Sequence, residues 1–344
     1  MGWLLAKMKY LMVSTYPPMR CGIGKYAFQM VRGLRREGHV VEVLSPEEGD
    51  GDFTGNLRGG LNLLKLLPYS IFYDRVLLQY HESFFYEDRP RGNLMSIAAT
   101  HLSFLIIFFI LNRKMEVIVH ELPSSYPFRL DYIFENLKWH MCPKLIFHTK
   151  REVLDFEQKF FKLSSTKYEI RSPASYYDRF RDISCGAARE ELGIPPDSVV
   201  FLCIGFIQPH KGFDRAIEAF SNNGNKKFKL FIVGSLRVRT EDHLSYLQEL
   251  IQMAGRTDNV QVVERYLSDE EFDTWISASN VVVIPYREIW SSAVAARAKL
   301  FKKSVIASDV GGLKEQITDS DILFRSDEEL RYIFKELAER LQRE

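Results

Sequence analysis

The chain has 344 residues, which is enough for about two domains. Hydrophobic residues make up 46% of it, so two separate cores can form. The 46 Lys and Arg residues nearly balance the 45 Asp and Glu residues, which excludes the strongly basic surface of a nucleic-acid-binding protein. Four widely separated cysteines form no CxxC pair, so we expect free thiols in the reducing cytoplasm.

The first half of the chain alternates strand-like and helix-like segments. The N-terminus is apolar at its start, but Lys7 and Lys9 interrupt it and no cleavage site follows, which argues against a secretory signal. Residues 1–7 read as an extension or as a short membrane-touching lead. Residues 9–14 then predict a strand, residues 25–38 a helix, and residues 40–45 a second strand. Further strand-like segments are RVLLQY (75–80), MEVIVH (115–120) and KLIFHT (144–149). This alternation predicts a parallel sheet that is covered by helices on both faces.

One apolar run, Leu102 to Leu111, raises the question of a membrane. Its ten residues are too few to span a bilayer, which needs about 20. We expect a buried core helix. The alternative is peripheral contact with the inner face of a membrane, which the Leu-rich and aromatic stretch 61–73 would support.

A second alternating unit begins near Ser198, with strand-like segments at 199–205, 228–235, 260–264, 281–284 and 304–309. Capping-box patterns at Thr149, Ser268 and Ser326 each predict the start of a helix. The proline-containing segment 172–198 reads as a linker. The predicted fold class is therefore α/β, with two Rossmann-like domains at 1–171 and 172–326 and a C-terminal helix at 327–344.

In open parallel sheets, ligands bind beyond the carboxyl ends of the strands. If the two domains face each other across a cleft, the loops after the strands line a single site. In the first domain these loops carry Gly22, Gly24 and two His-Glu pairs, His81-Glu82 and His120-Glu121. The glycines match neither a GxxxxGK[ST] nor a GxGxxG pattern, and a turn without function is the alternative. The His-Glu pairs lack metal-ligand spacing, so we predict no metal site and expect His120 to contact substrate.

Two loops of the second domain carry the strongest signals. Lys211 and Gly212 open a helix, where a lysine and free backbone amides suit a diphosphate; an ordinary surface lysine is the alternative. Arg237 can add a second cation. Glu288 ends a strand and can bind sugar hydroxyls, while the serines that follow it cap a helix and leave its amides free for phosphate oxygens.

Three stretches, taken in order, resemble the retaining GT-B glycosyltransferases of family GT4. They are TYPPMRCGIGKYAFQMVRGLRREGHVVEVLS (15–45), GFIQPHKGFDRAIEAF (205–220) and the region from YLSDEEF to DVGGLKEQI (266–317). The resemblance covers nearly the whole chain. It implies a nucleotide-sugar donor held mainly by the C-terminal domain, an acceptor held by the N-terminal domain, and no need for a metal. The leaving diphosphate would then take the acceptor proton while cations stabilise its charge.

The resemblance assigns Lys211 to the diphosphate, Glu288 to the first acid of the family's EX7E motif, and His120 to the reacting sugar. The predicted catalytic residues are these three. The predicted donor site comprises Gly22, Gly24, Gly205, Lys211, Gly212, Arg237, Arg265, Tyr266, Glu288, Ser291, Ser292, Ala293 and Val294. The predicted acceptor-binding residues are Tyr16, His81, Glu82 and Glu121.

The chain departs from the family pattern in three places. The second EX7E acid is replaced by Ala296 or Arg297, depending on the alignment, and Arg297 reads as a solvated helix residue if it does not replace that acid. The arginine usual before the loop lysine is absent, since Phe206 and Gln208 occupy its positions. The chain stops soon after ELAERLQRE (336–344), whereas family members usually continue in a helix that returns to the N-terminal domain, so we expect either weaker closure or a sequence that has been cut short.

The leading interpretation is a retaining hexosyltransferase, with a weak preference for mannose, that acts on a glycan, lipid-linked or small-molecule acceptor. The alternative is a non-catalytic GT-B protein that binds a sugar nucleotide or scaffolds a partner transferase, which the missing acid favours. A more remote alternative is a sugar-nucleotide 2-epimerase with the same architecture.

Overall fold

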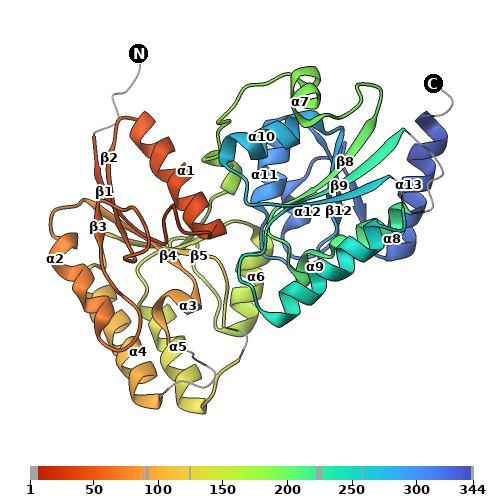
Figure 1. The fold of residues 1–344 in the computed structure, drawn as a ribbon. Coiled ribbons are helices and arrows are strands. Elements are labelled where there is room, and N and C mark those ends of the chain that lie inside the picture. Colours follow the sequence, from red (N-terminus) through yellow and green to blue (C-terminus); the bar gives the residue numbers. More distant parts are fainter. Residues whose placement is uncertain are drawn as a thin grey trace. The chain divides into compact units, whose positions relative to one another are not determined.

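A computed structural model describes residues 7–341 apart from 88, 90–92, 124, 222–226 and 258. Residues 1–6 of the predicted N-terminal lead and the last residues of the predicted C-terminal helix, 342–344, lie outside this range. The chain forms two compact units, Met1–Tyr176 and Tyr177–Glu344, because most contacts between residues fall within one unit or the other. Each unit is built on one parallel sheet (Figure 1). This architecture confirms the predicted fold class of two Rossmann-like domains.

Unit 1 contains a seven-stranded sheet of order β3-β2-β1-β4-β5-β6-β7, in which all pairs are parallel. Its strands are β1 (Lys9–Val13), β2 (Val40–Ser45), β3 (Phe53–Thr54), β4 (Arg75–Tyr80), β5 (Met115–Val119), β6 (Leu145–Phe147) and β7 (Tyr168–Ile170). Its helices are α1 (Gly22–Arg36), α2 (Leu66–Ser70), α3 (Glu82–Phe85), α4 (Leu94–Ile110), α5 (Arg129–Met141) and α6 (Lys150–Lys159), with short 3-10 turns η1 (Asn62–Lys65) and η2 (Pro173–Ser175).

Unit 2 contains a six-stranded parallel sheet of order β10-β9-β8-β11-β12-β13. Its strands are β8 (Val199–Ile204), β9 (Phe228–Gly234), β10 (Val260–Glu264), β11 (Val281–Ile284), β12 (Ser304–Ser308) and β13 (Ile322–Phe324). Its helices are α7 (Cys185–Leu192), α8 (Phe213–Phe220), α9 (Glu241–Ala254), α10 (Asp269–Ala278), α11 (Ala293–Leu300), α12 (Leu313–Gln316) and α13 (Asp327–Leu341), with the 3-10 turn η3 (Pro209–Lys211).

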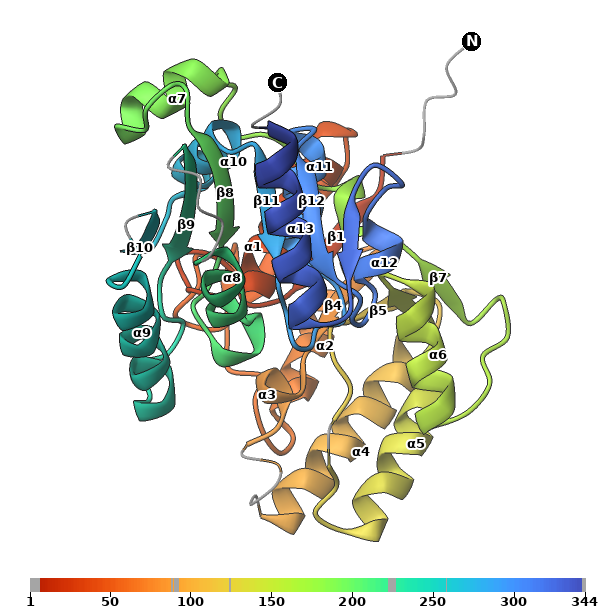
Figure 2. The same ribbon diagram turned by 90° about the vertical axis from the view of Figure 1, so that its right-hand side faces the viewer.

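Two apolar cores sandwich the sheet of unit 2. One core joins the sheet to α8, α9 and α13, where Phe334 packs against the rings of Phe201 and Phe220. The other core contains Trp275 and Ile276 of α10 together with part of α7. Figure 2 shows α13 lying along the sheet of this unit. Because both faces are covered, the strands are nearly continuous apolar runs rather than alternating ones.

Most predicted element types agree with the structure, and the differences are at the ends and in the linker. Helix α1 begins three residues earlier than predicted, so Gly22 and Gly24 lie in its first turn rather than before it. The predicted linker is irregular only in part, because Ser184 caps α7 within it. At Ser268 both hydrogen bonds of the predicted capping box are present.

The prediction of a fully buried helix around Leu102–Leu111 is wrong on one side. Helix α4 buries Phe104, Ile107 and Phe108 against the unit, but Leu102, Phe109 and Ile110 are exposed. Helix α4 contains no charged residue, so its outer face is apolar as well as its inner one. Within the described residues, no helix combines the length and the hydropathy that a bilayer crossing requires.

The loops at the carboxyl edge of unit 2 approach each other so closely that side chains are excluded at Gly234 and at two glycines of positive φ. Gly212 has φ +60°, and a Cβ atom there would overlap the carbonyl oxygen of Pro285. Gly311 has φ +54°, and its Cβ would overlap the carbonyl oxygen of Ile289. The loops after β8, β11 and β12 are therefore fixed to one another through their backbones.

We expect Gly212→Ala to destabilise the protein by at least about 2 kcal/mol. The alanine would have to adopt a left-handed backbone conformation, and its Cβ would clash with the carbonyl oxygen of Pro285. Urea denaturation measures this change. The control is Gly186→Ala in α7, where an added Cβ meets no atom within 4 Å. That control should change the free energy of unfolding by less than about 1 kcal/mol. Equal effects would show that the contact between the loops is not tight.

Candidate active site

The order of strands in unit 2 reverses between β8 and β11, which lie side by side although β9 and β10 separate them in sequence. In open α/β sheets such a switch point is where ligands bind, because the loops diverge to opposite faces of the sheet. The backbone amide of Arg287 donates to the carbonyl of His210 at 2.8 Å, and the guanidinium of Arg287 pairs with Asp214. The loop after β8 and the loop after β11 thus form one continuous edge.

An open pocket of about 690 Å³ lies at this edge, within unit 2. Its walls are Pro209, His210, Asp214, Tyr246, Glu249, Arg287 and Glu288. Of these, sequence reasoning named only Glu288 as a site residue. Asp214, Tyr246 and Glu249 come from helices α8 and α9, and nothing in their spacing indicated that they would meet Glu288.

Lys211 is a cation without a charged partner. Its ammonium group lies 3.8 Å from the centre of the Tyr286 ring, and among the described residues no side chain forms a hydrogen bond or an ion pair with it. The side chain is partly exposed, but its surroundings are poorly solvated, and this burial lowers the pKa of Lys211 to about 7. An ammonium group in poorly solvated surroundings that lacks an anion can bind one.

The loop between β11 and α11 is braced to present the start of that helix. Ser292 is the N-cap, and its hydroxyl accepts a hydrogen bond from the Ala295 amide, as the sequence predicted. The backbone of Ser292 also forms hydrogen bonds with the side chain of Gln316, a residue that sequence reasoning missed. The amides of Ala293 and Val294 belong to the first turn, where helical amides have no acceptor within the helix. They can therefore donate to an anion.

The remaining predicted donor residues of unit 2 lie at the same edge but are not equally available. Glu288 is exposed. Gly205 follows β8 with φ +128°, and Arg237 and Tyr266 are partly exposed. Arg265 is already engaged, because its guanidinium pairs with Glu271. Its backbone amide also donates to the carbonyl of Gly234, which fixes the turn after β10.

The position of the missing second acid is occupied by a structural ion pair. Ala296 is buried, and Arg297 is only 3% exposed, so the interpretation of Arg297 as a solvated residue is wrong. Its guanidinium pairs with Asp269 and Asp273 of α10. Asp273 in turn accepts hydrogen bonds from the backbone amides of Phe180 and Arg181. Arg297 therefore ties α11 to α10 and to the start of unit 2.

In unit 1, His120 follows β5 at the carboxyl edge of the sheet. Its Nε2 atom lies 2.5 Å from the side-chain oxygen of Gln79, and its ring packs edge-on against Tyr26 at 5.6 Å. Burial, with a smaller contribution from His148 and His81, lowers the pKa of His120 well below its usual value. His120 is therefore a neutral imidazole held in a fixed orientation.

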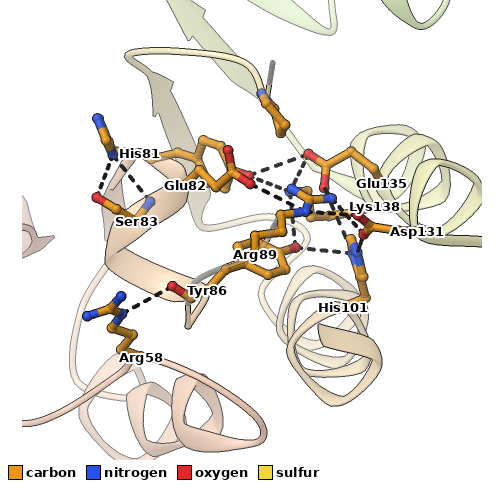
Figure 3. A network of polar contacts seen from close by, with 12 residues as sticks. Arg58, His81, Glu82, Ser83, Tyr86, Arg89, His101, Asp131, Glu135 and Lys138 are labelled. Carbon is orange, nitrogen blue, oxygen red and sulfur yellow. Dashed lines mark hydrogen bonds and ion pairs between the residues drawn. The ribbon is translucent and has the colours of Figure 1, made fainter. Parts of the chain in front are cut away.

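The other predicted residues of unit 1 are largely committed to internal contacts. His81 pairs with Glu121 at 3.1 Å, and Glu82 pairs with the buried Arg89 at 3.4 Å (Figure 3). Tyr16 is buried, and this burial raises its pKa to about 12. Gly24 allows α1 to pack against Thr15, since a Cβ there would lie 3.2 Å from the Thr15 carbonyl. Its small size is thus explained by packing within unit 1. Among the described residues, no group of three His, Cys, Asp or Glu side chains has the arrangement of a metal site.

We expect Arg297→Glu to destabilise the protein by about 3–5 kcal/mol, because it removes the partner of the buried Asp273 and adds a third carboxylate. Urea denaturation with circular dichroism measures this loss. The control is Lys314→Glu on the exposed surface of α12. It should change stability by less than about 0.5 kcal/mol. Unchanged stability of Arg297→Glu with stronger nucleotide binding would instead restore Arg297 as the place of the second acid.

Comparison with known proteins agrees with this architecture. Residues 186–336 match the family described as Glycosyl transferases group 1. A curated relative, D-inositol 3-phosphate glycosyltransferase 2 of Catenulispora acidiphila, is 28% identical over 182 residues, which are 51% of this chain and 42% of that protein. The chain spans about two fifths of the length of the curated relatives that it matches.

Solved structures match over nearly the whole chain at low sequence identity. The crystal structure of HepE from Anabaena in complex with UDP and glucose has a TM-score of 0.69 and 17% identity, and covers 97% of this chain and 91% of its own. Sucrose-phosphate synthase of Thermosynechococcus elongatus has a TM-score of 0.69 and 16% identity, with 96% and 90% covered. The fold is thus the GT-B fold, and residues 186–336 in the C-terminal unit match the family of glycosyl transferases of group 1.

Proposed function

We propose that the protein is a retaining glycosyltransferase that moves a hexose from a nucleotide-diphosphate sugar to a glycan, lipid-linked or small-molecule acceptor. The observation that carries this proposal is Lys211, a poorly solvated cation without a counter-charge beside the switch point of unit 2. The diphosphate of a donor supplies the missing anion. A structural neighbour, HepE, was solved in complex with UDP and with UDP-glucose, which supports this donor class.

Each part of the donor has a suitable partner in unit 2. Lys211 and the first amides of α11 suit the diphosphate, with Arg237 as a further cation. Glu288 is exposed beside them and suits the sugar hydroxyls. We assign the nucleobase of the donor to the backbone of the turn Glu264–Tyr266, because the side chain of Arg265 is already paired with Glu271. Gly205 and Gly212 allow the backbone to approach the ligand.

The proposed chemistry needs no metal and no dedicated base. The leaving diphosphate accepts the proton of the acceptor hydroxyl, and Lys211 stabilises the charge that develops on it. The acceptor is assigned to unit 1, where the neutral His120 can donate or accept a hydrogen bond without carrying charge. The name of the curated relatives makes D-inositol 3-phosphate one acceptor to test, beside lipid-linked sugars at the inner face of a membrane.

One observation favours a second candidate, a GT-B protein that binds a sugar nucleotide without transferring the sugar. Arg297 fills the place of the second acid with an internal ion pair, so the donor ribose lacks that contact. The two candidates differ in turnover. Both bind nucleotides, but only the transferase releases free nucleotide when donor and acceptor are present together.

The first test is a thermal-shift titration with UDP, GDP, ADP and their sugar conjugates, with and without Mg²⁺. A ligand at 100 times its dissociation constant should stabilise the protein by about 2.7 kcal/mol, which shifts the melting temperature visibly. We expect one nucleotide to be preferred, with no requirement for metal. No shift with any nucleotide would contradict both candidates.

The same titration should depend on pH. The free protein loses the Lys211 proton above pH 7, and a bound diphosphate restores it, so binding takes up a proton. The affinity should then fall by up to about tenfold per pH unit between pH 7.5 and 9. Lys211→Arg keeps its charge and should bind with little pH dependence. An equal pH dependence in this variant would show that another group titrates.

Glu288→Ala should abolish sugar transfer. It should also lower the affinity for the sugar nucleotide by about tenfold or more, because a charged hydrogen-bond acceptor for the sugar is lost. The affinity for the free nucleotide and the stability should stay unchanged, since Glu288 is exposed. Isothermal titration calorimetry with UDP and UDP-glucose, or with the preferred pair, measures the difference.

Glu249→Ala is the matched control, because Glu249 lines the same pocket from helix α9. It should leave the affinity for the sugar nucleotide unchanged. If both variants lower the affinity for the free nucleotide equally, Glu288 does not recognise the sugar and the assignment fails.

A further inference from the structure

Helices α4 and α5 of unit 1 share an outer face that no part of the described chain covers. Because β4, β5 and β6 are parallel, the two helices that connect them run in the same direction, and Figure 2 shows them side by side. Apolar side chains are exposed on both helices at helical spacing. They are Leu94, Met95, Leu102, Phe109 and Ile110 on α4, and Leu130, Ile133, Phe134 and Leu137 on α5, with Phe128 just before it.

The acids of these helices point inward. Helix α4 contains no charged residue, and the two acids of α5, Asp131 and Glu135, are both buried. Asp131 binds His101 and Arg89 at 2.7 Å each, and Glu135 binds Arg89 and Lys138 (Figure 3). The outer face is consequently free of carboxylates along both helices.

The charges of this buried network balance. Burial alone would raise the pKa values of Asp131 and Glu135, but their cationic and hydrogen-bonding partners hold both below their usual values. Burial lowers the pKa of His101, so it is neutral, and lowers that of Lys138 to about 8. Two buried carboxylates therefore face two cations, Arg89 and Lys138, and the partly exposed Glu82 also pairs with Arg89. This pairing removes the negative charge of α5 from the surface and fixes α5 against α4.

The charges at the margin of the face are mostly positive. Arg129 is exposed at the first residue of α5, and Arg113 is exposed just after α4. One acid is near, since Glu87 accepts a hydrogen bond from Ser96 in the first turn of α4. An uncharged apolar face with basic residues at its ends matches the boundary between acyl chains and anionic headgroups.

We propose that the outer faces of α4 and α5 dock on an anionic phospholipid bilayer. The helices lie in the plane of the interface. A partner protein or a second copy of the chain would fit the apolar area as well, but neither accounts for the removal of both α5 carboxylates together with the retention of Arg129 and Arg113.

The position of this face bears on the acceptor. Both helices begin at the carboxyl edge of the sheet of unit 1, the edge from which His81 and His120 project. A docked face would hold that edge close to the membrane, so an acceptor carried by a lipid could reach it. This last step rests on the proposed transferase function, whereas the docking itself does not.

Flotation of the full chain with lipid vesicles tests the proposal. We expect the protein to float with vesicles of phosphatidylcholine and phosphatidylglycerol, and less with phosphatidylcholine alone. Leu102→Glu should reduce flotation by about tenfold, because a charge replaces an inserted apolar side chain. Arg129→Ala should reduce binding to the anionic vesicles by about fivefold, and binding to neutral vesicles much less.

The matched control is Ile251→Glu on α9 of unit 2, because Ile251 and Leu102 are both 50% exposed. Ile251→Glu should float like the unchanged protein. The proposal is overturned if the protein does not float, or if both Glu variants lose flotation equally. Gel filtration covers the remaining case: a dimer that Leu102→Glu separates, without flotation, would make the face an interface between copies. The nucleotide-induced thermal shift should be unchanged in Leu102→Glu, so a failure of docking and a failure of the donor site are distinguishable.

Discussion

The close backbone contact between the loops after β8 and β11 is the constraint on which the proposed donor site depends. Gly212 approaches the carbonyl of Pro285 so closely that no side chain fits, and Arg287 adds a hydrogen bond to the carbonyl of His210. The parallel pairing of β8 and β11 brings these loops together at the switch point. Lys211 directly precedes Gly212, so this contact also positions its loop, while the side chain of Gln316 braces the first turn of α11.

Two basic residues of unit 2, Arg297 and Lys211, show how the surroundings of a charge decide whether it is already paired within the protein. Arg297 is buried with two aspartates and completes its own electrostatics. Among the described residues, Lys211 contacts only the face of the Tyr286 ring, so no carboxylate compensates the charge of its ammonium form. Leaving a cation in this state costs stability, and a bound anion offsets the cost. The residue type alone does not distinguish the two, because both are basic: Lys211 lies just before α8 and Arg297 lies within α11.

Unit 1 uses the opposite arrangement, in which charges are buried in balanced sets. On the inner side of α4 and α5, Arg89 pairs with Asp131 and Glu135, and Lys138 pairs with Glu135. Breaking such a set is costly, whereas keeping it intact is nearly neutral. Because these charges are buried, the outer surface of α4 and α5 is left apolar. The ion pairs also hold the two helices together, so that they present this surface.

The sequence by itself determined the fold class, the alternation of strands and helices, and the helix starts at Ser268 and Ser292. These depend on local apolar periodicity and on caps that lie within a few residues of one another. It also indicated that Lys211 and Glu288 follow strands, although their roles in binding stay predictions. Tertiary structure alone decided that Arg297 is buried, that Asp214 and Tyr246 line the pocket with Glu288, and that the acids of α5 face inward. These depend on partners 24 to 73 residues away in sequence. Local patterns do not encode such distant pairs, because the pairs arise only when strands and helices have packed.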